Sequence, residues 1–114
     1  MFGNSAYREV DAAYVESARQ QGALLVDVRG DAEVAQGVID GATHIPMHLI
    51  PLRAAELPRD KPVIFYCRSG ARSGQVCSFL AQQGHANLHN LAGGIMGWAR
   101  AGLPVVAPRQ AATI

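Results

Sequence analysis

The chain has 114 residues, a formal net charge of +1 at pH 7 and an apolar fraction of 49%, values typical of an ordinary globular protein. Its length suits one hydrophobic core, so we expect residues 1–114 to form a single domain. Its basic residues form no run that would attract nucleic acid, and no apolar stretch approaches the roughly 20 residues of a membrane span.

The first residues and the cysteines bear on the cell compartment. Met1 to Tyr7 lack the basic and apolar segments of a signal peptide. The two cysteines, Cys67 and Cys77, are separated by a predicted helix start, which argues against a disulfide between them. We therefore expect a cytoplasmic protein with reduced thiols.

Four segments are predicted to be strands. Tyr7 to Val10 is expected at a sheet edge, and Leu88 to Leu91 is a strand with a weaker apolar pattern. Ala23 to Val28 and Pro62 to Tyr66 are nearly continuous apolar runs rich in Val and Ile. Such runs are typical of strands that are buried on both faces of a parallel sheet.

Helices are predicted between and after these strands from capping residues and from glycine and proline stops. Their expected extents are Asp11 (as cap) to Gln20, Asp31 (as cap) to Ala35, Met47 to Glu56, Ser73 to Gln83 and Ile95 to Ala101. Because strands alternate with helices on short connections, the sequence predicts an α/β fold with a mostly parallel sheet and helices on both faces. The tail from Pro108 to Ile114 is expected to fray.

Cys67 stands where the apolar strand Pro62 to Tyr66 runs into the loop sequence CRSGARS. Ligands of parallel sheets gather at the carboxyl ends of strands. A glycine loop before a helix turns backbone N–H groups inward, and these groups together with Arg68 and Arg72 should lower the pKa of a thiol. We therefore interpret Cys67 as an activated nucleophile rather than as a small buried side chain at a strand end.

Cys77 has the opposite interpretation. It falls at helical spacing with Val76 and Leu80 on an apolar helix face, which favours a packing role. A resolving thiol is the alternative.

Three motifs together resemble those of the rhodanese-like sulfurtransferases, and the resemblance covers about Val10 to Pro104. The motifs are DVRGDAEVAQGVIDGATHIP from Asp27, CRSGARS from Cys67 and LAGGIMGW from Leu91. The resemblance implies that Cys67 takes up sulfur as a persulfide and that Asp27 and Arg29 support the loop. It further implies a sulfur-binding loop made by Arg68, Ser69, Gly70, Ala71, Arg72 and Ser73.

The first motif departs from the family pattern at one position. Where relatives commonly carry Gly-His-Ile, this chain has Gly37-Val38-Ile39, which puts local packing or the polarity of the entrance in doubt. We also expect Glu33 to pair with Arg29 across a helical turn.

The tryptophan and the histidines are expected to pack in the core or to lie in solvent rather than to take part in chemistry. Trp98 is expected to pack with Leu91 and Ile95 beneath the glycine pair. The histidines lack metal-ligand spacing with cysteine or acidic neighbours, so no metal site and no cofactor are predicted; they are His44, His48, His85 and His89.

The resemblance implies a sulfurtransferase that moves sulfur from an anion such as thiosulfate to cyanide in vitro, or to a thiol or a protein in the cell. A sulfur-carrying or regulatory module without turnover is one alternative. A phosphatase or arsenate reductase of the same fold is another, but in those relatives five residues separate cysteine from arginine, against four here between Cys67 and Arg72. The physiological donor, the acceptor and the oligomeric state stay open.

Overall fold

A computed structural model describes residues 6–109 and contains one five-stranded sheet in which every strand pairs parallel to its neighbour. The strands are β1 (Arg8–Val10), β2 (Leu24–Asp27), β3 (Thr43–His44), β4 (Val63–Tyr66) and β5 (Leu88–Leu91), in the order β1-β5-β4-β2-β3. The four predicted strands and the parallel α/β class are confirmed. The sequence analysis missed β3, which has only two residues and carries no apolar run.

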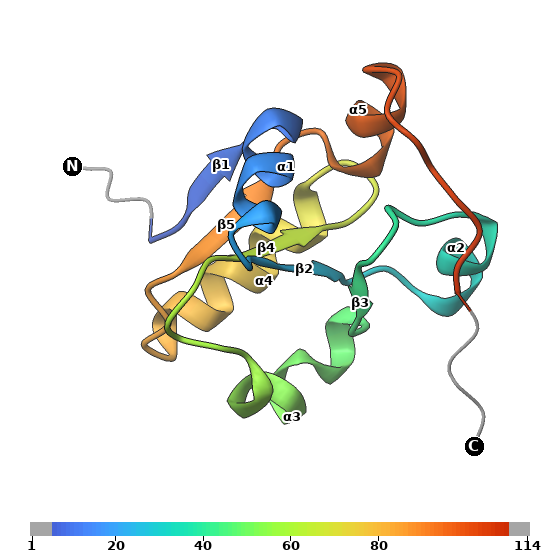
Figure 1. Ribbon diagram of the computed structural model, residues 1–114. Coiled ribbons are helices and arrows are strands. Elements are labelled where there is room, and N and C mark those ends of the chain that lie inside the picture. The colour runs from blue at the N-terminus through green and yellow to red at the C-terminus, as the bar shows by residue number, and fades with distance from the viewer. Residues whose placement is uncertain (1–5, 110–114) are drawn as a thin grey trace.

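Helices cover both faces of this sheet, as Figure 1 shows. They are α1 (Ala12–Gln20), α2 (Asp31–Gln36), α3 (Ile50–Arg53), α4 (Ala71–Gln82) and α5 (Gly94–Arg100), with 3-10 turns η1 (Met47–Leu49) and η2 (Ala54–Glu56) on either side of α3. Successive side chains of β4 point to opposite faces. Phe65 packs in the cluster with α4, and Ile64 packs in the cluster with α1 and α5, so the chain has one apolar core on each side of the sheet.

The start of α1 agrees with the prediction, whereas the starts of α2 and α4 differ from it. Asp11 caps α1 as expected, because its carboxylate accepts the N–H of Tyr14 at 2.9 Å. Asp31, however, is the first residue of α2, and the cap is Gly30. Helix α4 begins at Ala71, earlier than the predicted Ser73.

The segment 47–56 is not the continuous helix that was predicted. It divides into η1, α3 and η2, with Pro51 in the first turn of α3. A proline has no N–H to donate to the preceding turn, so a single helical ladder cannot run through this segment.

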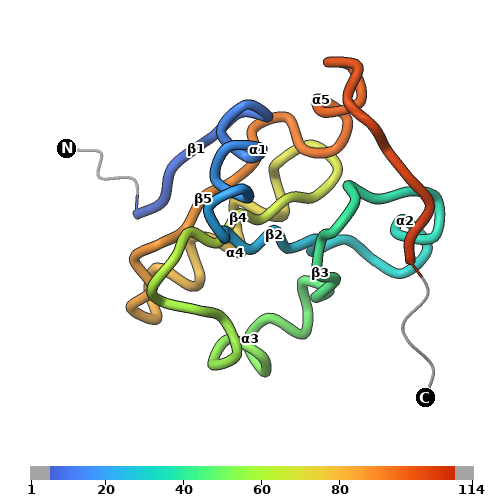
Figure 2. The backbone as a smooth tube through the Cα atoms, in the orientation of Figure 1, coloured from blue at the N-terminus to red at the C-terminus, as the bar shows by residue number. Residues whose placement is uncertain are grey.

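The chain after α5 folds back over α2, as the tube in Figure 2 shows. Val38 and Val106 form a backbone bridge with N–H to O distances of 2.8 and 2.9 Å. Arg109 forms an ion pair with Asp40 at 3.1 Å, so the predicted fraying does not apply at Arg109. The rest of that predicted tail, residues 110–114, lies outside the described residues.

Packing of Trp98 agrees with the prediction, since it shares one buried cluster with Leu91 and Ile95.

Within residues 6–109, no helix combines the length and the apolar character needed to cross a lipid bilayer.

Candidate active site

Cys67 directly follows β4, and its side chain lies on the sheet face that α4 covers. The residue is 1% exposed. Its Sγ accepts hydrogen bonds from the Gly70 N–H at 3.1 Å and from the Ser73 hydroxyl at 3.3 Å. Because β4 and α4 are joined by only four residues, the thiol is held close to the N-terminus of α4.

The loop has this shape because Gly70 takes a left-handed conformation with φ of +105°. A residue with a side chain adopts this conformation only at a cost. The Gly70 carbonyl accepts the N–H of Gly74 at 3.0 Å and so starts α4, while its N–H turns toward the sulfur. The first unpaired N–H groups of α4 and the loop N–H groups therefore surround one point, as an anion site requires.

These donors set the charge of the thiol. Burial alone raises the pKa of Cys67. Hydrogen bonds from the Ser73 hydroxyl and from the backbone of Ser73, Gly70 and Ser69 outweigh that effect, so the pKa lies below the ordinary thiol value. The thiolate, which is the nucleophilic form, is therefore favoured.

The two loop arginines do less for the thiol than the sequence predicted. Arg68 is exposed, and its Nε lies 3.1 Å from the Sδ of Met96. The Arg72 guanidinium makes two hydrogen bonds to the carboxylate of Glu33, at 2.7 and 2.8 Å. The largest causes that lower the pKa of Cys67 are thus the Ser73 hydroxyl and the backbone, not the two arginines.

The predicted pairing of Glu33 with Arg29 is wrong. The Arg29 guanidinium is buried against Asp27, with Nη2 at 2.7 Å from Oδ2, and Nη2 also donates to the Gly37 carbonyl at 2.7 Å. With Arg29 occupied, the Glu33 carboxylate turns to Arg72, which lowers the pKa of Glu33 to about 2.

Asp27 and Arg29 brace the strand next to the loop. Asp27 pairs in register with Tyr66, the residue before Cys67. The guanidinium of Arg29 lies over the Tyr66 ring, 5.5 Å from its centre. Arg29 thus connects the end of β2 to the strand that carries the thiol.

The glycine motif after β5 contacts the loop backbone directly. The N–H of Ile95 donates to the Cys67 carbonyl at 3.0 Å, and that of Met96 donates to the Arg68 carbonyl at 3.1 Å. A Cβ added at Gly94 would overlap these same two carbonyl groups. The motif therefore needs a glycine because the start of α5 packs against the backbone carbonyls of Cys67 and Arg68.

Asn90 in β5 is a site residue that the sequence analysis missed. It is 2% exposed, and its Nδ2 donates to the Gly70 carbonyl at 3.0 Å and to the Glu9 carboxylate at 3.0 Å. The available signal was an amide side chain within a predicted strand, since a buried amide needs a hydrogen-bond partner.

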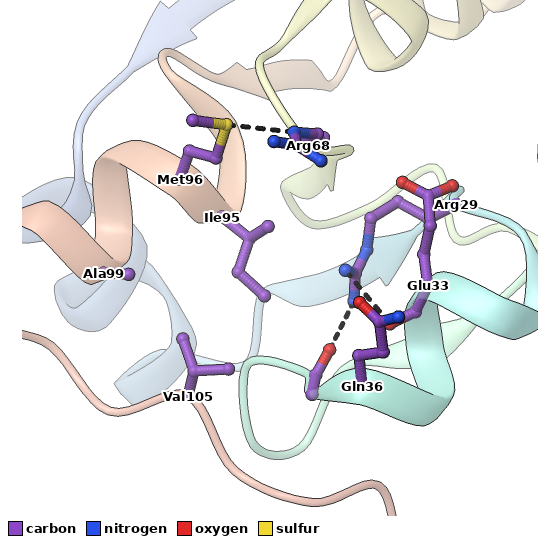
Figure 3. Close-up of a pocket in the computed structure, with 9 residues that line it drawn as sticks. Arg29, Glu33, Gln36, Arg68, Ile95, Met96, Ala99 and Val105 are labelled. Atoms are coloured by element: carbon purple, nitrogen blue, oxygen red, sulfur yellow. Dashed lines mark hydrogen bonds between the residues drawn. The ribbon is translucent and has the colours of Figure 1, made fainter.

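A pocket of about 240 Å³ borders the loop at Arg68. Figure 3 shows Arg29 and Glu33 on one side of it and Ile95, Met96 and Val105 on the other. The pocket thus has a charged wall from Arg29, between β2 and α2, and from Glu33 of α2, and an apolar wall from α5 and the chain that follows it.

The remaining loop residues differ in their burial. Ser69 is exposed, Ala71 is the first residue of α4, and Ser73 is fully buried beside the thiol.

In the described part of the chain, no three His, Cys, Asp or Glu side chains gather as metal ligands would. Cys77 is buried in the apolar cluster with Val76 and Leu80, the packing position that its spacing predicted.

Comparisons with known proteins agree with this geometry. Residues 11–101 match the family described as Rhodanese-like domain. A protein named sulfurtransferase from Allochromatium vinosum is 60% identical over 85 residues, which are 75% of this chain and 79% of that protein. Thiosulfate sulfurtransferase GlpE from Haemophilus influenzae (strain PittEE) is 36% identical over 101 residues, covering 88% of this chain and 95% of that protein.

A solved structure gives the same answer for the fold. A rhodanese-related protein from Thermoplasma volcanium superimposes with a TM-score of 0.78 at 33% identity, over 88% of this chain and 98% of that one. These relatives support sulfurtransferase activity as the general class of reaction. The chain belongs to the rhodanese-like domain family.

Proposed function

We propose that this chain is a thiosulfate sulfurtransferase that carries sulfur as a persulfide on Cys67. The observation that carries the proposal is the buried Sγ that accepts hydrogen bonds from Gly70 and Ser73 at the start of α4. Inward N–H groups stabilise a thiolate and can equally stabilise a terminal persulfide anion at the same place.

The reaction has two steps. The Cys67 thiolate attacks the outer sulfur of thiosulfate, a sulfur–sulfur bond to the protein forms, and the bond to the sulfonate sulfur breaks to release sulfite. An acceptor nucleophile then attacks the terminal sulfur of the persulfide and regenerates the thiolate. Cyanide accepts the sulfur in vitro and leaves as thiocyanate, whereas a thiol or a protein thiol is the proposed cellular acceptor. A reaction with these two separate steps has ping-pong kinetics.

The other loop residues have binding and supporting roles in this proposal. The backbone from Arg68 to Ser73 surrounds the transferred sulfur, and the exposed Arg68 attracts an anionic donor. Asp27 and Arg29 support the loop through the end of β2. No carboxylate lies between Cys67 and Ser73 to protonate a leaving oxygen, which weighs against phosphatase chemistry.

We further propose that residues 1–114 act as one domain in a reducing compartment such as the cytoplasm. Two free thiols, at Cys67 and Cys77, support a reducing setting.

Intact mass after incubation with thiosulfate tests the proposal. We expect the wild type and Cys77→Ala to gain the mass of one sulfur atom and to lose it when cyanide is added. Cys67→Ala should gain nothing. A wild type that gains no sulfur would refute thiosulfate as donor, and a gain that survives in Cys67→Ala would refute the assigned nucleophile.

A further inference from the structure

The ion pair between Glu33 and Arg72 changes what charge the loop presents to an incoming molecule. Arg72 lies in the first turn of α4, and its pKa is raised chiefly by its hydrogen bond to Glu33 and further by the nearby Cys67 thiolate. Glu33 comes from α2 and engages the guanidinium through both of its oxygens, at 2.7 and 2.8 Å. Each side chain is about one-third exposed, at 37% for Arg72 and 35% for Glu33.

The pair holds its charge across the whole physiological range. The pKa of Glu33 is lowered to about 2, chiefly by its hydrogen bond to Arg72, so the carboxylate stays ionised at neutral pH. A guanidinium that already makes a bidentate contact has fewer N–H groups left for a ligand. The positive charge that Arg72 would offer to an anion is therefore offset by a negative charge beside it.

Arg68 is then the loop arginine that remains available. Among residues 6–109, no carboxylate lies within ion-pair distance of it. The loop thus offers an arriving anion one uncompensated guanidinium instead of two.

The adjoining pocket favours a sulfur donor that has both a charged part and an apolar part. Glu33 lines this pocket together with Arg68, and its other wall is apolar, made by Ile95, Met96 and Val105. One uncompensated cation beside an apolar wall suits an organic group that carries a single negative charge. A small dianion would leave the apolar wall unused and would face the Glu33 carboxylate.

We propose that Glu33 is a specificity-determining residue that restrains the use of dianionic donors and favours organic sulfane-sulfur donors with a single negative charge. The proposal rests on the sulfur transfer proposed above. Thiosulfonates represent this donor class: the Cys67 thiolate takes their outer sulfur, the bond to the sulfonyl sulfur breaks, and a sulfinate anion leaves.

The first test measures charge at the thiol without any sulfur transfer. Alkylation of Cys67 by the anion iodoacetate is compared with alkylation by neutral iodoacetamide at low salt, and the modified peptide is identified by mass. In Glu33→Gln, the ratio of the iodoacetate rate to the iodoacetamide rate should rise about three- to tenfold, the size expected for one uncompensated charge at a partly exposed site. Salt should reduce this gain, because exposed charges are screened.

Two variants serve as controls for this ratio. Glu56→Gln removes the same carboxylate from the exposed Arg53–Glu56 pair and should leave the ratio within about twofold of the wild type. Glu33→Asp keeps the charge and should lie near the wild type. An unchanged ratio in Glu33→Gln, with a normal iodoacetamide rate, would overturn the proposal.

The second test compares two donors that differ by one charge, thiosulfate and methanethiosulfonate. In Glu33→Gln, the ratio of kcat/KM for thiosulfate to that for methanethiosulfonate should rise about three- to tenfold, mainly through KM for thiosulfate. A raised alkylation ratio with an unchanged donor ratio would refute the role of Glu33 in donor selection. A wild type that accepts sulfur from neither donor would refute sulfur transfer, and donor selection with it, whereas the alkylation ratio would still report on the charge set by Glu33.

Discussion

Cys67 and Cys77 are both buried thiols of the same strand, loop and helix unit, yet their surroundings favour opposite charge states. Cys67 lies before the first turn of α4 and receives hydrogen bonds from Gly70 and Ser73, and its pKa is lowered despite burial. Cys77 lies within α4, and its Sγ faces the carbonyl of His89 at 3.6 Å. Burial raises the pKa of Cys77 to about 12.

The comparison shows that burial does not decide whether a thiol is reactive. The deciding factor is whether hydrogen-bond donors reach the sulfur. At Cys67 the Ser73 hydroxyl and the loop N–H groups outweigh burial, whereas at Cys77 burial raises the pKa with no such donor among residues 6–109 to oppose it. The three predictions below test this account.

The largest expected effect comes from separating the loop from α5. In Gly94→Ala, the added methyl group would overlap the carbonyls of Cys67 and Arg68, at a residue whose φ is +60°. We expect the free energy of unfolding to fall by about 3 kcal/mol and alkylation of Cys67 at pH 7 to slow.

Gly102→Ala is the matched control for that substitution. Gly102 also has a positive φ, of +83°, but no atom lies within 4 Å of an added Cβ. Its cost should be about 1 kcal/mol with no change in the alkylation rate. Equal losses in the two variants, measured by urea unfolding, would contradict the proposed contact between α5 and the loop.

A smaller effect on the alkylation rate is expected when one hydrogen-bond donor to the Cys67 Sγ is removed. Ser73→Ala deletes the hydroxyl that is the largest cause lowering the pKa of Cys67, so that pKa should rise. Alkylation by iodoacetamide at pH 7 should slow about three- to tenfold, in line with the net contribution of about 0.5–1.5 kcal/mol from one typical hydrogen bond. Ser78→Ala, which changes an exposed serine of the same helix, should leave the rate unchanged. Equal rates for both variants and the wild type would show that the Ser73 hydroxyl does not stabilise the thiolate.

A third effect concerns how stability depends on pH. The folded protein keeps a proton on Cys77 up to about pH 12, whereas a thiol of the unfolded chain loses it near pH ~8.5. Its contribution to stability is therefore complete below the unfolded pKa and is lost as pH rises above it. Between pH 8 and pH 10 the wild type should lose about 1–2 kcal/mol more of its free energy of unfolding than Cys77→Ala.

Cys67→Ala should change the same pH slope in the opposite direction. The pKa of Cys67 is lowered by folding, so ionisation of this thiol adds stability as pH rises from the folded toward the unfolded pKa. Urea unfolding at several pH values measures both slopes. If both cysteine variants changed the slope of unfolding free energy against pH in the same direction, the assigned pKa directions would be contradicted.

The sequence predicted the parts of the fold that depend on local patterns. The apolar run before Cys67 predicted β4, and the glycine loop after it predicted a helix start near the thiol. The capping role of Asp11 was also predictable, because a cap depends on residues only three positions apart.

The contacts that the sequence did not predict join residues far apart in the chain. Glu33 was expected to pair with Arg29, four residues away, but it pairs with Arg72 because Arg29 is buried against Asp27. Asn90 reaches Gly70 only because β5 lies beside β4 in the sheet. Side-chain pairing of this kind depends on strand order, which local periodicity does not encode.

The strand order also has a consequence for synthesis of the protein. The strand β5 lies between β1 and β4, and the N–H groups of Ile95 and Met96 hold the carbonyls of Cys67 and Arg68. On the ribosome, the thiol therefore emerges 28 residues before Ile95, whose N–H donates to the Cys67 carbonyl, roughly 1.5 to 6 seconds at usual elongation rates. During that interval the nascent chain carries Cys67 without its completed environment. The contacts between α5 and the loop carbonyls form only after translation has passed α5.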